Sequence, residues 1–128
     1  MKKNFLIVVA NYYKDISKGL LSSSKKLIPK GSRLKIIEVP GVFEIPMTIK
    51  KNIKRYDAFI ALGCVIKGQT PHFDFISQAS INAIMNLSID NKKPIGNGII
   101  TCLSLKQAKV RKKKGAEATK AVLSILSQ

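Results

Sequence analysis

Four short apolar runs, separated by segments of helical period, constrain the fold of this chain more than any other feature. They cover residues 5–10, 34–39, 58–65 and 95–101 and are rich in β-branched side chains. Their apolar residues are continuous rather than alternating, which is typical of strands buried on both faces of a parallel sheet. We therefore expect four parallel strands.

The segments between these runs carry apolar residues at helical spacing. The predicted faces are Leu20, Leu21, Leu27 and Ile28; Ile45, Ile49 and Ile53; Ile76, Ala79, Ala83 and Leu87; and Ala118, Ala121, Val122 and Ile125. Strand and helix alternate four times, with the last helical region broken near Gly115. Such alternation implies right-handed crossovers and predicts an α/β fold with a doubly wound parallel sheet.

Length and composition place this sheet in one cytoplasmic domain. The 128 residues are enough for one core and too few for two, so we expect a single domain over residues 1–128. Residues 5–10 are too short for a signal peptide, and no window is apolar enough to span a membrane. Cys64 and Cys102 are expected to be buried thiols rather than a disulfide.

The formal net charge of +16 leaves two interpretations open. A basic chain attracts phosphates, so a nucleic-acid groove has to be considered. The lysines are scattered, however, and no zinc-finger spacing, RNA-recognition signature or KH loop accompanies them. We favour a lysine-rich solvated surface and expect no specific nucleic-acid partner.

Ligands of doubly wound sheets bind outside the carboxyl ends of the strands, so the loop after the third run is the first place to search. Thr70 and Pro71 predict a helix start, with Thr70 as N-cap and Pro71 at the first helical position. Gly68 lets the backbone approach a ligand, and the N–H groups of Gln69 and Thr70 would favour an anion such as phosphate.

His72, the only histidine, would then lie in the first turn of that helix. The positive end of the helix dipole disfavours the protonated imidazole, which suits general acid–base work. A surface or capping histidine is the alternative.

The segments that follow the other strands offer further candidates with ordinary alternatives. Glu44 could hold ligand hydroxyl groups while the backbone of Val42 and Phe43 contacts a planar ring, or it could be a carboxylate in the first turn of a helix. Tyr12 could stack on a heterocycle or be packed half-buried. Arg111 could bind phosphate in a bidentate manner or be one more solvated charge.

Several kinds of site are not predicted. Cys64 belongs to a strand end without an assured cationic partner, so a nucleophilic thiolate is discounted. One histidine and two distant cysteines give no metal-ligand spacing, and we expect no metal. The dinucleotide fingerprint and the P-loop are both absent from the sequence.

Taken together, the motifs resemble the 6,7-dimethyl-8-ribityllumazine synthase family of riboflavin biosynthesis. The matching segments are, in order, VPGVFEIP from Val39, ALGCVIKGQTPHFD from Ala61, GNGIIT from Gly96 and KGAEA from Lys114. The resemblance implies a flavodoxin-like three-layer α/β/α sandwich with a four-stranded parallel sheet. It also implies a homopentamer, or a multiple of it, with active sites between subunits and no cofactor.

The implied enzyme is a transferase with two small-molecule substrates. It condenses 5-amino-6-(D-ribitylamino)uracil with 3,4-dihydroxy-2-butanone 4-phosphate and releases phosphate and water. An archaeal-type riboflavin synthase of similar fold, and a basic nucleic-acid-binding α/β module, are the alternatives.

The resemblance also carries residue roles onto matching positions. Substrate binding falls on Tyr12, Val42, Phe43, Glu44, Cys64, Val65, Ile66 and Asn97. Phosphate binding falls on Gln69, Thr70, Arg111 and Lys114. His72 would move protons during Schiff-base formation, phosphate elimination and ring closure. Asn97, Arg111 and Lys114 would come from the adjacent subunit.

Overall fold

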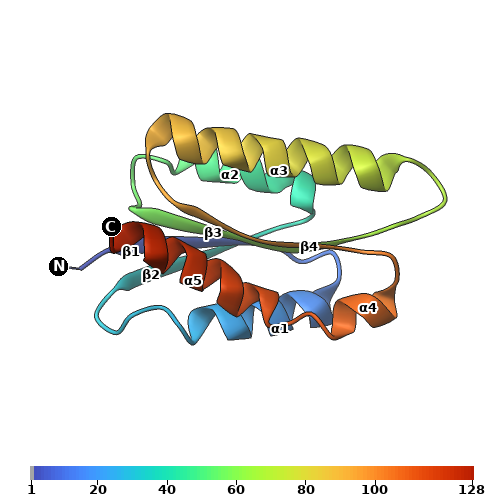
Figure 1. Cartoon of the computed structure of the whole chain (residues 1–128), viewed down its shortest axis with the longest axis horizontal. Helices are drawn as coiled ribbons and strands as arrows, with labels where there is room; N and C mark the ends of the chain where they lie inside the picture. The colour runs from blue at the N-terminus through green and yellow to red at the C-terminus, as the bar shows by residue number, and fades with distance from the viewer. Residues whose placement is uncertain (1) are drawn as a thin grey trace.

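The computed structural model describes residues 2–128 and shows the expected parallel sheet (Figure 1). The elements are β1 (Asn4–Ala10), α1 (Lys14–Lys25), β2 (Arg33–Val39), the 3-10 helix η1 (Val42–Glu44), α2 (Ile45–Lys51), β3 (Ala58–Ile66), α3 (His72–Asn91), β4 (Ile95–Cys102), α4 (Leu105–Lys109) and α5 (Lys114–Leu126). The four strands are parallel, in the order β2-β1-β3-β4. The predicted α/β class, a flavodoxin-like sandwich, is therefore confirmed.

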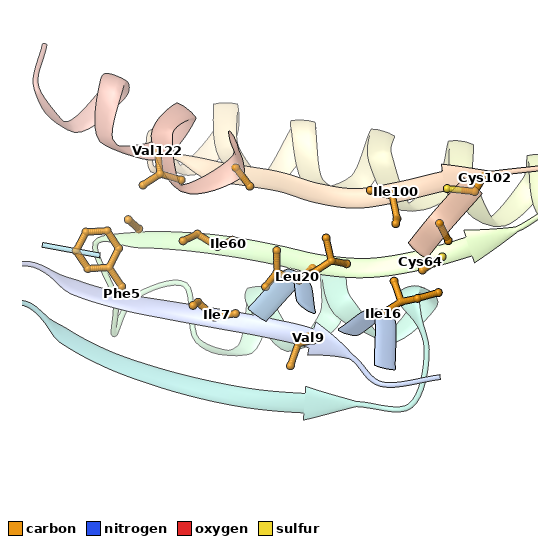
Figure 2. Packing of buried hydrophobic residues seen from close by; sticks show 14 residues of the cluster. Phe5, Ile7, Val9, Ile16, Leu20, Ile60, Cys64, Ile100, Cys102 and Val122 are labelled. Carbon is orange, nitrogen blue, oxygen red and sulfur yellow. The ribbon is translucent and has the colours of Figure 1, made fainter. Parts of the chain in front are cut away.

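The sheet lies between two helical layers, as Figure 1 shows: α2 and α3 cover one face, and α1, α4 and α5 cover the other. Each face has its own apolar cluster. Figure 2 shows the cluster on the α1 and α5 side, where Ile7 and Ile60 of the central strands face Leu20 of α1. The central strands are buried on both faces, which explains why their apolar residues do not alternate.

Two predicted helix faces are wrong in part. On α3, Ala79 is exposed, and the helix instead buries Ser77, Ser80 and Ile84. On α5, Ala121 and Ile125 are exposed. Two of the three buried positions of α3 are serines, which apolar periodicity does not register.

The α5 helix buries Gly115, Ala118, Thr119 and Val122.

The end of the first helix also differs from the prediction. The first helix stops at Lys25, so Leu27 and Ile28 follow it rather than share its face.

None of the helices within residues 2–128 is long and apolar enough to cross a membrane. Cys64 and Cys102 are buried free thiols, as predicted.

Candidate functional site

A cleft of about 630 Å³ opens at the carboxyl end of the sheet. Its lining residues come from the ends of β1 and β3, from η1 and from the start of α3: Tyr12, Tyr13, Gly41, Val42, Phe43, Glu44, Cys64, Val65, Ile66, His72 and Ile76. These are the loops in which ligands of doubly wound sheets collect. We call this space the cleft.

Val42, which lines the cleft, packs directly against Gly63 of β3. A Cβ built on Gly63 would lie 2.7 Å from Cγ2 of Val42 and 3.1 Å from Cβ of Ala10. The turn after β2 can therefore lie directly against β3. Val42 is buried in this contact, whereas the neighbouring Phe43 is 63% exposed at the rim. An apolar ring at the rim is available for contact with a planar ligand.

Two tyrosines also line the cleft. The rings of Tyr12 and Tyr13 meet edge to face with centroids 4.9 Å apart and an interplanar angle of 79°. Tyr12 is 73% exposed, so one face of its ring is free to stack on a heterocycle. Burial, followed by the nearby Tyr12 and Cys64, raises the pKa of Tyr13. The Tyr13 hydroxyl therefore keeps its proton at neutral pH.

Glu44 lies at a helix start, as one of its two interpretations predicted, and its position also leaves the ligand-binding interpretation open. It is the N-cap residue of α2, and it also lines the cleft. Its Oε1 lies 3.1 Å from the position that a Cβ on Gly41 would take, so the carboxylate folds back over the turn. The backbone N–H of Glu44 donates to the Gly41 carbonyl at 3.2 Å. The turn thus fixes the backbone of Glu44, whose carboxylate is an acceptor in the lining of the cleft.

The structure places His72 at the first residue of α3, with its side chain lining the cleft. The predicted cap is shifted by one residue: Pro71 is the N-cap residue, and Thr70 precedes it. The Thr70 hydroxyl oxygen accepts a 3.4 Å hydrogen bond from the His72 N–H. Pro71 has no N–H and takes the cap position, because its carbonyl accepts from the N–H groups of Asp74 and Phe75.

Gln69 and Thr70, predicted to bind phosphate, are exposed on the loop beside His72 and are not among the cleft-lining residues. Within residues 2–128, neither of their backbone N–H groups has a hydrogen-bond acceptor. Free N–H groups next to His72 can donate hydrogen bonds to an anion.

Cys64 lies where β3 reaches the cleft, but its thiol is not set up as a nucleophile. Burial, followed by the neighbouring Cys102, raises the pKa of the Cys64 thiol to about 12. The two cysteines belong to adjacent strands and to the same apolar cluster, as Figure 2 shows. A protonated thiol there contributes shape and packing rather than nucleophilic attack.

Three predicted site residues lie elsewhere. Asn97, Arg111 and Lys114 line a second space of about 500 Å³ along the edge strand β4, which we call the cationic pocket. Its full lining is Ile81, Asn97, Ile99, Ile100, Thr101, Val110, Arg111, Lys113, Lys114 and Glu117. The Oδ1 of Asn97 accepts from the Ile99 N–H at 3.1 Å, which fixes its amide. The cleft and the cationic pocket have no lining residue in common.

Sequence reasoning missed several lining residues. Tyr13, Gly41 and Ile76 line the cleft, and Lys113 lines the cationic pocket. Tyr13 and Gly41 adjoin predicted residues at strand ends, a signal that could have included them. Among residues 2–128, no three His, Cys, Asp or Glu side chains are grouped to hold a metal.

Known proteins match the chain over almost its whole length. A family model described as 6,7-dimethyl-8-ribityllumazine synthase matches residues 2–128. A protein of that name from Methylorubrum populi is 40% identical, and the match covers 95% of this chain and 80% of the relative. One from Agrobacterium fabrum is 38% identical, with 98% and 93% covered.

A third relative, 6,7-dimethyl-8-ribityllumazine synthase 1 of Rhodopseudomonas palustris, is 42% identical over 94% of this chain and 82% of its own length. These matches agree with the motif order and with the parallel α/β sheet. They lend no support to a riboflavin synthase or a nucleic-acid-binding module. The chain belongs to the 6,7-dimethyl-8-ribityllumazine synthase family.

Proposed function

We propose that this chain catalyses its family's reaction in a site that two neighbouring subunits complete. The cleft of one subunit would bind 5-amino-6-(D-ribitylamino)uracil, and the cationic pocket of the next would supply charges for 3,4-dihydroxy-2-butanone 4-phosphate. The products are 6,7-dimethyl-8-ribityllumazine, phosphate and water. The enzyme acts as a transferase of riboflavin biosynthesis, with small-molecule substrates and no cofactor.

The observation that carries this proposal is the division of the predicted residues between two separate spaces. The aromatic, carboxylate and imidazole groups line the cleft, while Asn97, Arg111 and Lys114 line the cationic pocket. A phosphorylated substrate bound in the cleft alone would lack these cations. A second subunit that presents its edge strand β4 would supply them.

The cleft suits the pyrimidine substrate in shape and chemistry. The exposed faces of Tyr12 and Phe43 offer stacking surfaces, and the Glu44 carboxylate can accept hydrogen bonds from ribityl hydroxyl groups. The backbone from Cys64 to Ile66 passes along the cleft where β3 ends, so its peptide groups can pair with the ring edge.

Catalysis in this arrangement combines orientation with proton transfer. Holding an amine against a ketone converts a bimolecular condensation into a step within one complex. His72 lines the cleft and directly follows the loop of Gln69 and Thr70, so one imidazole there would move protons for Schiff-base formation, for loss of phosphate and for ring closure. Gln69 and Thr70 lie beside it and would bind the phosphate together with Arg111 and Lys114.

The assembly we propose is a homopentamer in the cytoplasm. A cyclic arrangement uses one heterologous contact repeatedly, so every cleft meets the cationic pocket of a neighbour. Analytical ultracentrifugation measures the assembly: a mass of five chains supports it, and a monomer that is fully active at all concentrations contradicts it.

The activity test incubates the protein with both substrates and follows lumazine fluorescence. A rate above the uncatalysed background supports the activity, and a rate equal to background contradicts it.

A subunit-mixing experiment tests the shared site. His72→Ala retains an intact cationic pocket and Arg111→Ala an intact cleft, so each alone should be poorly active when the phosphorylated substrate is kept below its wild-type KM. Co-assembled at equal amounts, about one quarter of the interfaces would pair two intact halves by random association. Recovery of roughly a quarter of the wild-type rate supports sharing. Activity no higher than the mean of the separate variants shows that each site lies within one subunit.

A further inference from the structure

The start of α5 lies directly on the backbone of α1. A Cβ built on Gly115 would lie 2.1 Å from the carbonyl oxygen of Leu20, closer than any side chain permits. One built on Gly19 would lie 2.8 Å from Cγ and Cδ of Lys112. The alkyl stem of Lys112 therefore runs across α1, which accounts for its absence from the lining of the cationic pocket.

The hydroxyl group of Ser23, on α1, joins two backbone groups of this same region. Its Oγ lies 2.6 Å from the Lys112 carbonyl oxygen and accepts from the Ala116 N–H at 3.1 Å. The Leu20 carbonyl, on the same helix, is 3.1 Å away. A hydroxyl has one proton, and the shorter contact identifies Lys112 as its acceptor. Ser23 therefore bonds to residues about ninety positions away rather than to its own helix.

The bond to Ala116 replaces a missing helix cap. The N-cap residue of α5, Lys113, makes no side-chain hydrogen bond to the helix. Ala116 is the third residue of α5, the position whose N–H an N-cap serine would ordinarily satisfy. Ser23 supplies that oxygen from another helix. It thereby fixes both the turn before α5 and the first turn of the helix.

The turn that Ser23 fixes carries the cations of the proposed site. Arg111, Lys113 and Lys114 flank Lys112 and line the cationic pocket. Two further backbone bonds shape the turn, from Lys114 N–H to the Arg111 carbonyl and from Gly115 N–H to the Lys112 carbonyl. We infer that Ser23 is a positioning residue, which holds these cations in register for the phosphate group of the substrate. This inference rests on the proposed function.

The test is Ser23→Ala, which removes one donor and one acceptor. The expected result is a rise of about five- to tenfold in KM for 3,4-dihydroxy-2-butanone 4-phosphate, the size of one or two lost hydrogen bonds. The KM for the pyrimidine and the kcat at saturation should stay within about twofold of wild type, because the cleft is untouched.

Two serines of the same helix provide matched controls. Ser22 is exposed, and its hydroxyl has no hydrogen-bond partner within residues 2–128, so Ser22→Ala should behave as wild type. Ser24 is buried and its Oγ lies 2.7 Å from the Thr119 Oγ1, deeper in the same interface. Ser24→Ala should lower stability without raising KM for the phosphorylated substrate. If Ser23→Ala and Ser24→Ala change that KM equally, or neither does, the positioning role is refuted.

A second measurement keeps this inference separate from the proposed function. Hydrogen exchange at the Ala116 amide should be faster in Ser23→Ala than in Ser24→Ala, whatever the protein's activity. If wild type makes no lumazine, the proposed function fails. If wild type is active while exchange and KM are unchanged in Ser23→Ala, only the positioning role fails.

Discussion

The side chain of Val42 occupies the space that a Cβ on Gly63 would need, since the two atoms would lie 2.7 Å apart. Gly63→Ala must therefore shift the Val42 side chain, or η1 with it, away from β3. We expect a loss of about 1–3 kcal/mol in the free energy of unfolding, as for other overpacked cores. The KM for the pyrimidine should rise as the cleft wall moves. Chemical denaturation and steady-state kinetics measure the two effects.

Gly68→Ala is the control for stability. A Cβ at Gly68 meets nothing within 4 Å, so its unfolding free energy should change by less than about 0.5 kcal/mol. Equal losses in the two variants would show that the close contact at Gly63 is not the cause.

Removal of the imidazole tests the role of His72. His72→Ala should lower kcat by about 10²-fold or more, because it removes the only imidazole of the chain, the side chain that most often transfers protons in catalysis. Lumazine fluorescence under saturating substrates measures the change, and circular dichroism checks the fold. Unchanged turnover would remove His72 from the mechanism.

Substituting a cation of the turn before α5 should affect KM for the phosphorylated substrate more than substituting another basic residue nearby. Arg111→Ala should raise KM for the phosphorylated substrate about tenfold, the effect of losing a charge-assisted contact. Lys109→Ala removes an equal charge from an exposed position of α4 and should change KM for the phosphorylated substrate by less than about twofold. Similar effects in both variants would mean that general charge attraction, rather than the pocket, sets this KM.

The raised pKa of Cys64 predicts both its reactivity and a stability effect at high pH. In the folded protein this pKa is about 12, against 9.0 ordinarily, so at pH 8 the thiolate population is lower on the order of a thousandfold. Iodoacetamide should therefore modify native Cys64 far more slowly than unfolded Cys64, as peptide mass analysis will show. Rapid native labelling would contradict the buried, protonated state.

The sign of the stability effect follows from the same shift. Above pH 9 the unfolded thiol loses its proton while the folded thiol keeps it, so the unfolded state binds fewer protons. This stabilising term is complete below pH 9 and is lost progressively as pH rises toward 12. Cys64→Ala should show a smaller decline in denaturation midpoint between pH 9 and 11 than wild type. Equal declines would place the titrating group elsewhere.

Ser80 offers a stabilising substitution. Its hydroxyl is buried and, within residues 2–128, has no hydrogen-bond partner. Removing an unsatisfied buried hydroxyl should make Ser80→Ala more stable by about 1 kcal/mol, as measured by denaturant unfolding. Ser24→Ala, which breaks the 2.7 Å bond to Thr119, should have the opposite sign. Loss of stability in Ser80→Ala would reveal a partner for its hydroxyl, such as a buried water.

The two central strands could be predicted from sequence because burial on both faces makes nearly all of their residues apolar. The runs at residues 5–10 and 58–65 fall within β1 and β3, the central pair. The position of the cleft followed from the rule that ligands collect at the carboxyl edge of such sheets. The roles of individual residues there came from the family motifs.

Helix contacts made by small or polar residues could not be predicted in this way. Ser24 and Thr119 pack through hydroxyl groups, and Gly115 through its backbone, so none of them adds to an apolar period. The Ser104 cap of α4, which accepts from the Gln107 N–H, is a local signal that was available but unused. The separation of Arg111 from His72 is a property of the fold that spacing along the chain does not reveal.

The division between cleft and cationic pocket also bears on how the protein has to be assayed. If the two halves meet only across a subunit boundary, the rate per milligram is not a constant of the molecule. It falls on dilution as subunits separate and returns on concentration. The measured rate then depends both on the amount of protein and on the fraction of it that is assembled.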